Sequence, residues 1–219
     1  MAKTTTGAKR GQSTRAYDSS RRRAMAADTQ LAVIQAAAQL FAERGWAGTG
    51  MRDIAREAGV SVETVYGTGG SKSQLLLRAI DLGVRGDTAP IPLAERPEFL
   101  AIGTGDRPAR LLTATRMMSA QYARVARLHR TLESGAVNDE ELAAKLDEVR
   151  ARQLLTFRDG LALILGQQPP PELVEGLQAI GSPEVYLLLV QAAGWSAQQY
   201  EEWLASTLAR LVDHIPEEK

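Results

Sequence analysis

The chain has 219 residues, of which 44% are hydrophobic and 24% charged, and this composition excludes a collagen-like or wholly disordered protein. It contains no cysteine, so disulfides, thiolate metal sites and cysteine nucleophiles are excluded as well. The net charge is zero, but basic residues outnumber acidic ones in residues 1–85, and acidic residues predominate in residues 86–219. This uneven distribution is expected of a protein that brings only one end close to phosphate groups.

The N-terminal segment is basic and lacks apolar periodicity. Residues 1–27 are rich in Thr, Gly, Ser, Lys and Arg and include the run Arg21-Arg22-Arg23, which predicts a disordered basic arm. Such an arm either aids solubility or contacts phosphates or the minor groove of DNA. The sequence shows no apolar leader and no unbroken apolar run of about 18 residues, so we expect a cytoplasmic protein with no membrane partner.

Apolar residues at three- and four-residue spacing, together with polar capping residues, predict three helices over residues 28–45, 51–58 and 61–66. A Gly-rich break at residues 67–70 follows, and Ser71 is placed to cap a fourth helix that runs through Leu82. Prolines at three positions between residues 90 and 97 then interrupt helical structure. These signals predict a first domain over residues 28–85.

The remainder of the chain, residues 86–219, is predicted to form a second helical domain. Two long apolar-periodic segments, 107–133 and 139–165, are each about 40 Å long if helical throughout. Shorter helices are expected around 172–180, from 183, and from 196 to about 214. No segment has the pattern of a strand. The sequence therefore predicts an all-α fold of about nine to ten helices, with an N-terminal three-helix helix-turn-helix domain and a C-terminal helical bundle.

Residues 49–66 have the spacing of a helix-turn-helix. Ala55 is small where the two helices touch, Gly59 allows the positive φ of the turn, and Ile54, Val60 and Val65 are apolar toward the first helix. The opposite face then enters a major groove, where side chains read base edges and contact phosphates. The residues predicted to bind DNA are Thr49, Gly50, Arg52, Ser61, Val62, Glu63, Thr64, Tyr66 and Lys72.

The same region resembles the DNA-binding signature of the tetracycline-repressor (TetR) family. The resemblance covers residues 29–80 and is carried by the segments 40–46, 51–55 and 58–61, by Val65-Tyr66 and by Lys72. The family usually has an aromatic residue three positions before this lysine, and this chain has Gly69 there, which leaves the junction to the fourth helix less anchored. The C-terminal segments 182–186, 194–196 and 200–204 also resemble one branch of the family.

The resemblance implies a homodimeric transcriptional regulator, most often a repressor, that a small-molecule effector releases from a palindromic operator in double-stranded DNA. For the effector pocket, flexible and aromatic side chains on the two long helices are candidates: Met117, Met118, Tyr122, Phe157 and Leu161. For the dimer face, the apolar residues of the last two helices are candidates: Val185, Leu188, Leu189, Ala192, Trp203, Leu204, Leu208 and Leu211. The alternative function is a helical protein-interaction module with a degenerate helix-turn-helix.

An enzyme is not expected, and neither a cofactor nor a metal is implied by the sequence. The segment 67–73 differs from a phosphate-binding loop because Ser71, rather than Gly, precedes Lys72 and because a helix precedes the loop. His129 and His214 have no acidic or cysteine partner at ligand spacing, which argues against a zinc site or catalytic dyad.

Overall fold

The computed structural model describes residues 11–213 and 215, and within this part of the chain the fold is all-α, as predicted, with no strand. The α-helices are α1 (Gly11–Arg44), α2 (Met51–Glu57), α3 (Val62–Gly69), α4 (Lys72–Arg85), α5 (Pro97–Leu100), α6 (Arg107–Ala136), α7 (Glu140–Leu165), α8 (Pro171–Ile180), α9 (Pro183–Tyr186) and α10 (Ala197–Val212). Two 3-10 turns, η1 (Leu93–Glu95) and η2 (Ala101–Gly103), and a π-helical turn, η3 (Leu187–Ala192), complete the fold.

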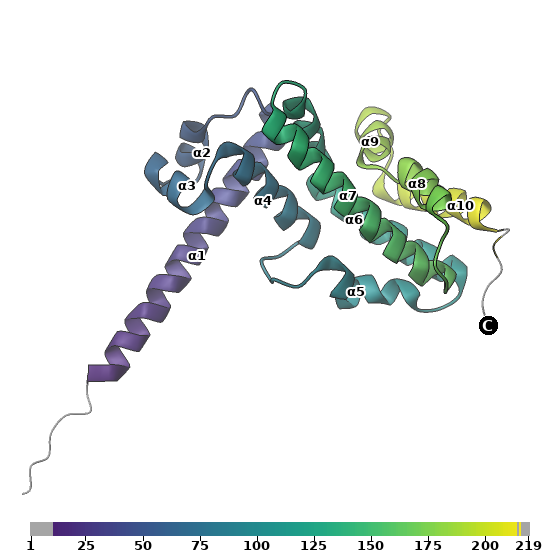
Figure 1. The fold of residues 1–219 in the computed structure, drawn as a ribbon, viewed down its shortest axis with the longest axis horizontal. Coiled ribbons are helices and arrows are strands. Elements are labelled where there is room, and N and C mark those ends of the chain that lie inside the picture. Colours follow the sequence, from purple (N-terminus) through teal and green to yellow (C-terminus); the bar gives the residue numbers. More distant parts are fainter. Residues whose placement is uncertain (1–10, 214, 216–219) are drawn as a thin grey trace, which may run out of the picture.

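Helix α1 begins 17 residues earlier than predicted, at Gly11 instead of residue 28. Its N-terminal half extends away from the other helices (Figure 1), and residues 21–28 are exposed. Residues 12–44 contain neither Gly nor Pro and are rich in Ala and Arg, which favour helix even without a packed face. Residues 11–27 of the predicted basic arm form the N-terminal part of α1, and residues 1–10 lie outside the described residues.

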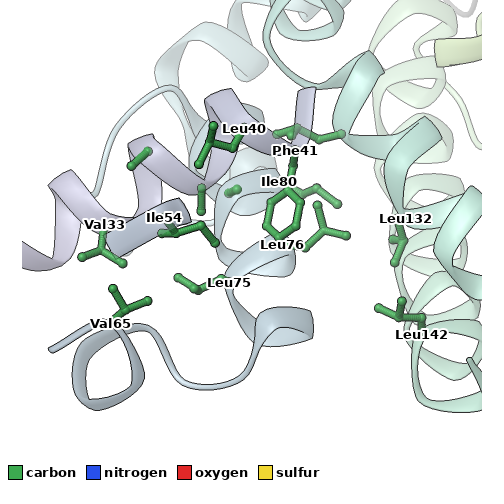
Figure 2. Close-up of a cluster of buried hydrophobic side chains, with 14 of the residues drawn as sticks. Val33, Leu40, Phe41, Ile54, Val65, Leu75, Leu76, Ile80, Leu132 and Leu142 are labelled. Atoms are coloured by element: carbon green, nitrogen blue, oxygen red, sulfur yellow. The ribbon is translucent and has the colours of Figure 1, made fainter. Parts of the chain in front are cut away.

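Helices α1 to α4 share one core, which also includes residues from the C-terminal part of α6 and the N-terminal part of α7 (Figure 2). The fully buried side chains shown there come from all six helices: Val33, Leu40, Phe41, Ile54, Val65, Leu75, Leu76, Ile80, Leu132 and Leu142. Each such side chain contributes about 1.5–3 kcal/mol when removed from water. This common core fixes the position of the first four helices on the long α6–α7 pair.

Helices α6 and α7 form an antiparallel pair, with contacts that run in opposite order along the two helices. The Arg110 guanidinium donates to the carbonyl oxygen of Ile164, and Arg150 forms an ion pair with Glu133 at 3.1 Å. Helix α10 packs against α6, and α8 packs against α7. A second core, which includes Phe99, is buried among these elements.

A buried arginine organises the proline-rich segment between α4 and α5. The Arg96 side chain donates to both carboxylate oxygens of Asp87, at 2.8 and 2.7 Å, and to the carbonyl oxygens of Arg85, Ala89 and Ile91. These hydrogen bonds from Arg96 hold the pKa of Asp87 well below its usual range. The linker is therefore ordered by side-chain hydrogen bonds although prolines exclude a regular helix.

One segment of the described residues, Pro171–Ala192, is long and apolar enough to cross a membrane by composition alone, with a mean hydropathy of 1.3. It is not one continuous α-helix, because a turn at Gly181-Ser182 separates α8 from α9. Helix α8 packs against α7, and α9 packs against α6. Its apolar residues are therefore divided between the second core and an outward face described below.

Candidate nucleic-acid interface and interior cavity

The helix-turn-helix has the geometry that the sequence predicts. Gly59 lies between α2 and α3 with a φ of 66°, a conformation that side chains with a Cβ rarely adopt. The Val60 amide donates to the Ala55 carbonyl oxygen at 3.0 Å, which closes the turn. Ile54, Ala55 and Val65 are buried against α1. These contacts fix α3 relative to α2.

Side-chain caps set the start of α3. The Ser61 hydroxyl accepts a hydrogen bond from the Thr64 amide at 3.2 Å and lies 3.1 Å from the Thr64 hydroxyl. The pKa of Glu63 is lowered by its own backbone amide and by the Ser61 side chain, so this carboxylate is ionised at neutral pH. The first turn of α3 therefore presents two hydroxyls and one negative charge.

The outer side of α2 and α3 carries most of the predicted DNA-binding residues. Arg52, Ser61, Glu63 and Tyr66 are exposed, and 55% of Tyr66 is accessible to solvent. Val62 and Thr64 are half-buried, and Val62 also packs against the core. We call these six residues the α3 surface. Their arrangement leaves polar and aromatic groups accessible at the N-terminal end of a short helix.

Two predicted residues have other roles. Thr49 is only 2% exposed, and its hydroxyl lies 2.9 Å from the Gly45 carbonyl oxygen and 3.1 Å from that of Leu40. Its hydroxyl therefore donates to carbonyl oxygens at the C-terminal end of α1, and the side chain is not accessible to DNA. The Gly50 amide donates to the Asp53 carboxylate at 3.2 Å, so this amide is not available for a phosphate.

Lys72, predicted to contact phosphate, is half-buried and joins α4 to the end of α1. Its ammonium donates to the Trp46 carbonyl oxygen at 2.5 Å and lies 4.1 Å from the centre of the Trp46 ring. Burial lowers the pKa of Lys72. The buried Thr131 hydroxyl from α6 similarly donates to the Phe41 carbonyl oxygen. Neither long-range contact leaves a signal in the local sequence pattern.

The glycine at position 69 is accounted for by packing. A Cβ at Gly69 would lie 2.5 and 2.9 Å from two side-chain carbons of Leu75, which is fully buried. Leu75 thus occupies the space that a side chain at position 69 needs. The Thr68 carbonyl oxygen accepts hydrogen bonds from Arg78 and Gln30, which hold the junction to α4. The expectation of a less anchored junction is therefore wrong.

A cavity of about 1000 Å³ lies along α6 and α7. All five residues nominated from the sequence line it: Met117, Met118, Tyr122, Phe157 and Leu161. No local sequence pattern indicates the walls supplied by α4, η1 and α5, among them Ile80, Leu93 and Phe99. These segments are distant in sequence, and only the packing of α4 and α5 onto the long helices brings them to the cavity.

Titratable side chains gather at one end of this cavity. His129 is 4% exposed, and burial lowers its pKa to about 4, so the imidazole is neutral at pH 7. Its only hydrogen-bond contacts among the described residues are with the Gln153 side-chain amide nitrogen, 3.1 Å from Nε2. Burial and a hydrogen bond with Glu184 raise the pKa of Glu133, which also pairs with Arg150.

The residues predicted for the dimer face do not all lie on one surface, because the helical periodicity of α10 buries some of them and exposes others. Leu204 and Leu208 are fully buried in the second core, together with Tyr200 and Val212, so these two residues do not belong to an outward face. Leu188 is 63% and Leu211 40% exposed. The other nominated residues, Val185, Leu189, Ala192 and Trp203, are at least partly exposed. Several of them line a shallow groove with Ile180.

Among residues 11–213 and 215 there is no cluster of three or more His, Cys, Asp or Glu side chains with the arrangement of a metal site.

Comparison with known proteins identifies the N-terminal region. Residues 33–79 match the family described as bacterial regulatory proteins, tetR family. No curated protein matches the sequence. Among solved structures, a tetR-family transcriptional regulator from Streptomyces coelicolor has a TM-score of 0.63 and 20% identity, covering 85% of this chain and 81% of that one. A transcriptional regulator from Rhodococcus sp. Rha1 has a TM-score of 0.61 and 21% identity, covering 84% of this chain and 96% of that one. The family match spans the last part of α1, α2, α3 and most of α4.

Proposed function

We propose that this chain, whose residues 33–79 match the tetR family of bacterial regulatory proteins, is a repressor that binds a palindromic operator as a homodimer and leaves it when a small molecule fills the cavity. The observation that supports DNA binding most directly is the α3 surface. It projects from a well-packed helix-turn-helix in which the Ser61 side chain caps α3 and the Val60 amide closes the turn. Such a helix reads base edges in the major groove. A role on DNA also favours the cytoplasm.

Four members of the α3 surface suit particular contacts with DNA. The Val62 methyl groups suit a thymine methyl, the Thr64 hydroxyl suits a base edge, and the exposed Tyr66 hydroxyl suits a phosphate. Glu63 accepts from a cytosine amino group or orients Arg52, since an isolated carboxylate is repelled by phosphates. The side chain of Lys72 is bound to Trp46, so a phosphate contact by Lys72 requires that this hydrogen bond be released.

A dimer follows from the number of bases that one helix can read. A single α3 reaches a few base pairs, whereas two copies about 34 Å apart read successive major grooves. The outward apolar residues of η3 and α10, in particular Leu188 and Leu211, form an apolar surface that a second copy would cover. We propose this surface as the dimer interface.

In this proposal, α4 connects the cavity to α3. Ile80, Asp81 and Val84 of α4 line the cavity, and α4 begins three residues after the end of α3. Asp81 also pairs with Arg152 of α7 at 2.9 Å. A ligand that favours a different position of α4 therefore changes the spacing of the two α3 helices. The free energy by which the ligand weakens operator binding is at most the difference between its binding free energies for the two conformations.

We expect selection of random duplex DNA on the purified protein to recover a palindrome whose affinity falls with salt. Thr64→Ala and Tyr66→Ala should each weaken binding to this site by about tenfold or more, because each removes a contact to DNA. Thr113→Ala, which removes a hydroxyl from α6 far from α3, is the matched control and should bind as the native protein does. Absence of enrichment at low salt would contradict DNA binding and favour the protein-interaction module.

Leu188→Glu should convert the dimer to a monomer, measured by analytical ultracentrifugation. A charge at the centre of an apolar interface is buried without a partner, so the dissociation constant should rise at least about 100-fold. Leu155→Glu is the matched control, since Leu155 is 51% exposed on α7, away from the proposed interface. A dimer that survives Leu188→Glu would place the interface elsewhere.

A further inference from the structure

The cavity changes in character along its length. On α6, Met117 and Met118 lie toward one end, and His129 and Glu133 lie toward the other. Helix α7 runs antiparallel to α6 and has the same apolar-to-polar gradient. The side chains of Phe157 and Met118 both lie next to Gly181, and Gln153 contacts His129. Met118 and His129 are eleven residues apart, which corresponds to about 16 Å along the helix. The cavity is therefore elongated, with an apolar end and a polar end.

The apolar end is closely packed with carbon. Leu161, Ile164, Phe99 and Ile102 are each less than 5% exposed and line this part of the cavity. No ionisable group is present among these four residues or the two methionines. A ligand group held here gains from the removal of apolar surface from water and finds no partner for a charge. This end therefore suits the hydrocarbon part of a ligand.

The polar end has one buried group with unused hydrogen-bonding capacity. A neutral imidazole has one N–H donor and one acceptor nitrogen. The Gln153 side-chain nitrogen lies 3.1 Å from Nε2 and 3.4 Å from Nδ1 of His129, and because an amide nitrogen only donates, it can serve only whichever ring nitrogen is the acceptor. No other described residue makes a hydrogen bond to this ring. The ring N–H, inside a side chain that is 96% removed from solvent, is thus left for a ligand in the cavity.

The charges around His129 do not favour a charged ligand. On α6 the carboxyl group of Glu133 is held by Arg150, and on α7 the Arg152 guanidinium is held by Asp81. Glu184 of α9 adds a further carboxylate near the imidazole. Glu133 and Glu184 share a hydrogen bond, and Arg150 balances the charge of this carboxyl pair. A cationic ligand group would therefore lose its water without gaining an unpaired carboxylate, and an anionic one would meet the carboxyl pair and a neutral ring.

We propose that the cavity binds an uncharged amphipathic molecule whose hydrocarbon part lies between Met118 and Phe157 and whose hydroxyl or carbonyl oxygen accepts a hydrogen bond from His129. This inference rests on the proposed function only in treating the cavity as the effector site. It names the class of the ligand by shape and chemistry: elongated, largely apolar, and with one neutral oxygen at one end.

The test compares molecules with the same chain and different head groups. Decan-1-ol, kept below its solubility limit, and decanoate and decylammonium, kept below their critical micelle concentrations, are titrated into the full-length protein by calorimetry at pH 7. Decan-1-ol should bind at least tenfold more tightly than either ion. His129→Phe should weaken decan-1-ol about tenfold and leave the decanoate affinity unchanged, because it removes only the hydrogen bond. Met118→Trp, which fills the apolar end, should weaken all three ligands.

Each outcome separates this inference from the proposed function. Tighter binding of either ion, or a decan-1-ol affinity that His129→Phe does not change, would overturn the ligand class. Absence of binding by all three, in a protein that still binds its operator, would also overturn the ligand class while DNA binding stands. Failure of the native protein to enrich any DNA would instead count against the proposed function, whichever ligand the cavity binds.

Discussion

Gly69→Phe should lower the free energy of unfolding by about 3 kcal/mol or more, measured by chemical denaturation. The new ring would need the space that Leu75 fills, since even a Cβ at position 69 lies 2.5 Å from a Leu75 methyl carbon. Overpacking of a buried site typically costs about 1–3 kcal/mol, and a whole aromatic ring lies at the upper end of this range. The effect is expected although family members usually carry an aromatic residue at this position.

The competition between the two side chains can be measured with a double-mutant cycle. Leu75→Ala alone should cost about 2–5 kcal/mol because it leaves a cavity. In the double variant the ring fills this cavity. The loss of unfolding free energy in the double variant should therefore be smaller than the sum of the two single-variant losses by about 2 kcal/mol. Gly67→Ala is the control: Gly67 is exposed, in the same helix, and a Cβ there meets nothing within 4 Å. Additive losses would mean that Leu75 does not occupy the site of residue 69.

Acid should destabilise the protein through His129. The pKa of His129 in the folded protein, about 4, lies below the usual histidine value of 6.5, so between these values the unfolded chain binds the proton more readily than the folded one. This contribution to stability is complete above pH 6.5 and is lost as the pH falls toward 4, by up to about 3 kcal/mol. Unfolding free energies measured from pH 4 to 7 should show this loss.

The comparison with His129→Gln isolates the contribution of this residue, because glutamine does not titrate. The native protein should lose stability relative to the variant as the pH falls from 6.5 to 4. Glu133 acts in the opposite direction, since its raised pKa means that the folded state takes up its proton first. Subtracting the unfolding free energy of the variant from that of the native protein at each pH removes the contribution of Glu133. Parallel pH profiles would show that His129 is not kept neutral in the folded protein.

The parts of the fold that depend on neighbours in sequence were predictable. Ser61, Asp53 and Gly59 act within a few residues of themselves, as caps and as a turn with positive φ, so the helix-turn-helix could be recognised from residue type and spacing. The apolar-periodic segment 139–165 matches α7, which the Asp139 side chain caps and which ends before Gly166, whose φ is 74°. The five residues nominated for an effector pocket line one cavity, since helical periodicity places them on the inner face of α6 and α7.

The sequence by itself determined the class of fold, the helix-turn-helix and the identity of its exposed side chains, because these follow from short-range hydrogen bonding and periodicity. The tertiary structure decided which of two apolar faces of α10 is buried, and therefore that Leu204 and Leu208 belong to the core. It also decided that Lys72 and Thr49 satisfy carbonyl oxygens at the end of α1, and that Leu75 replaces a side chain at Gly69. These outcomes depend on contacts between segments brought together only by packing, for which a local pattern carries no information.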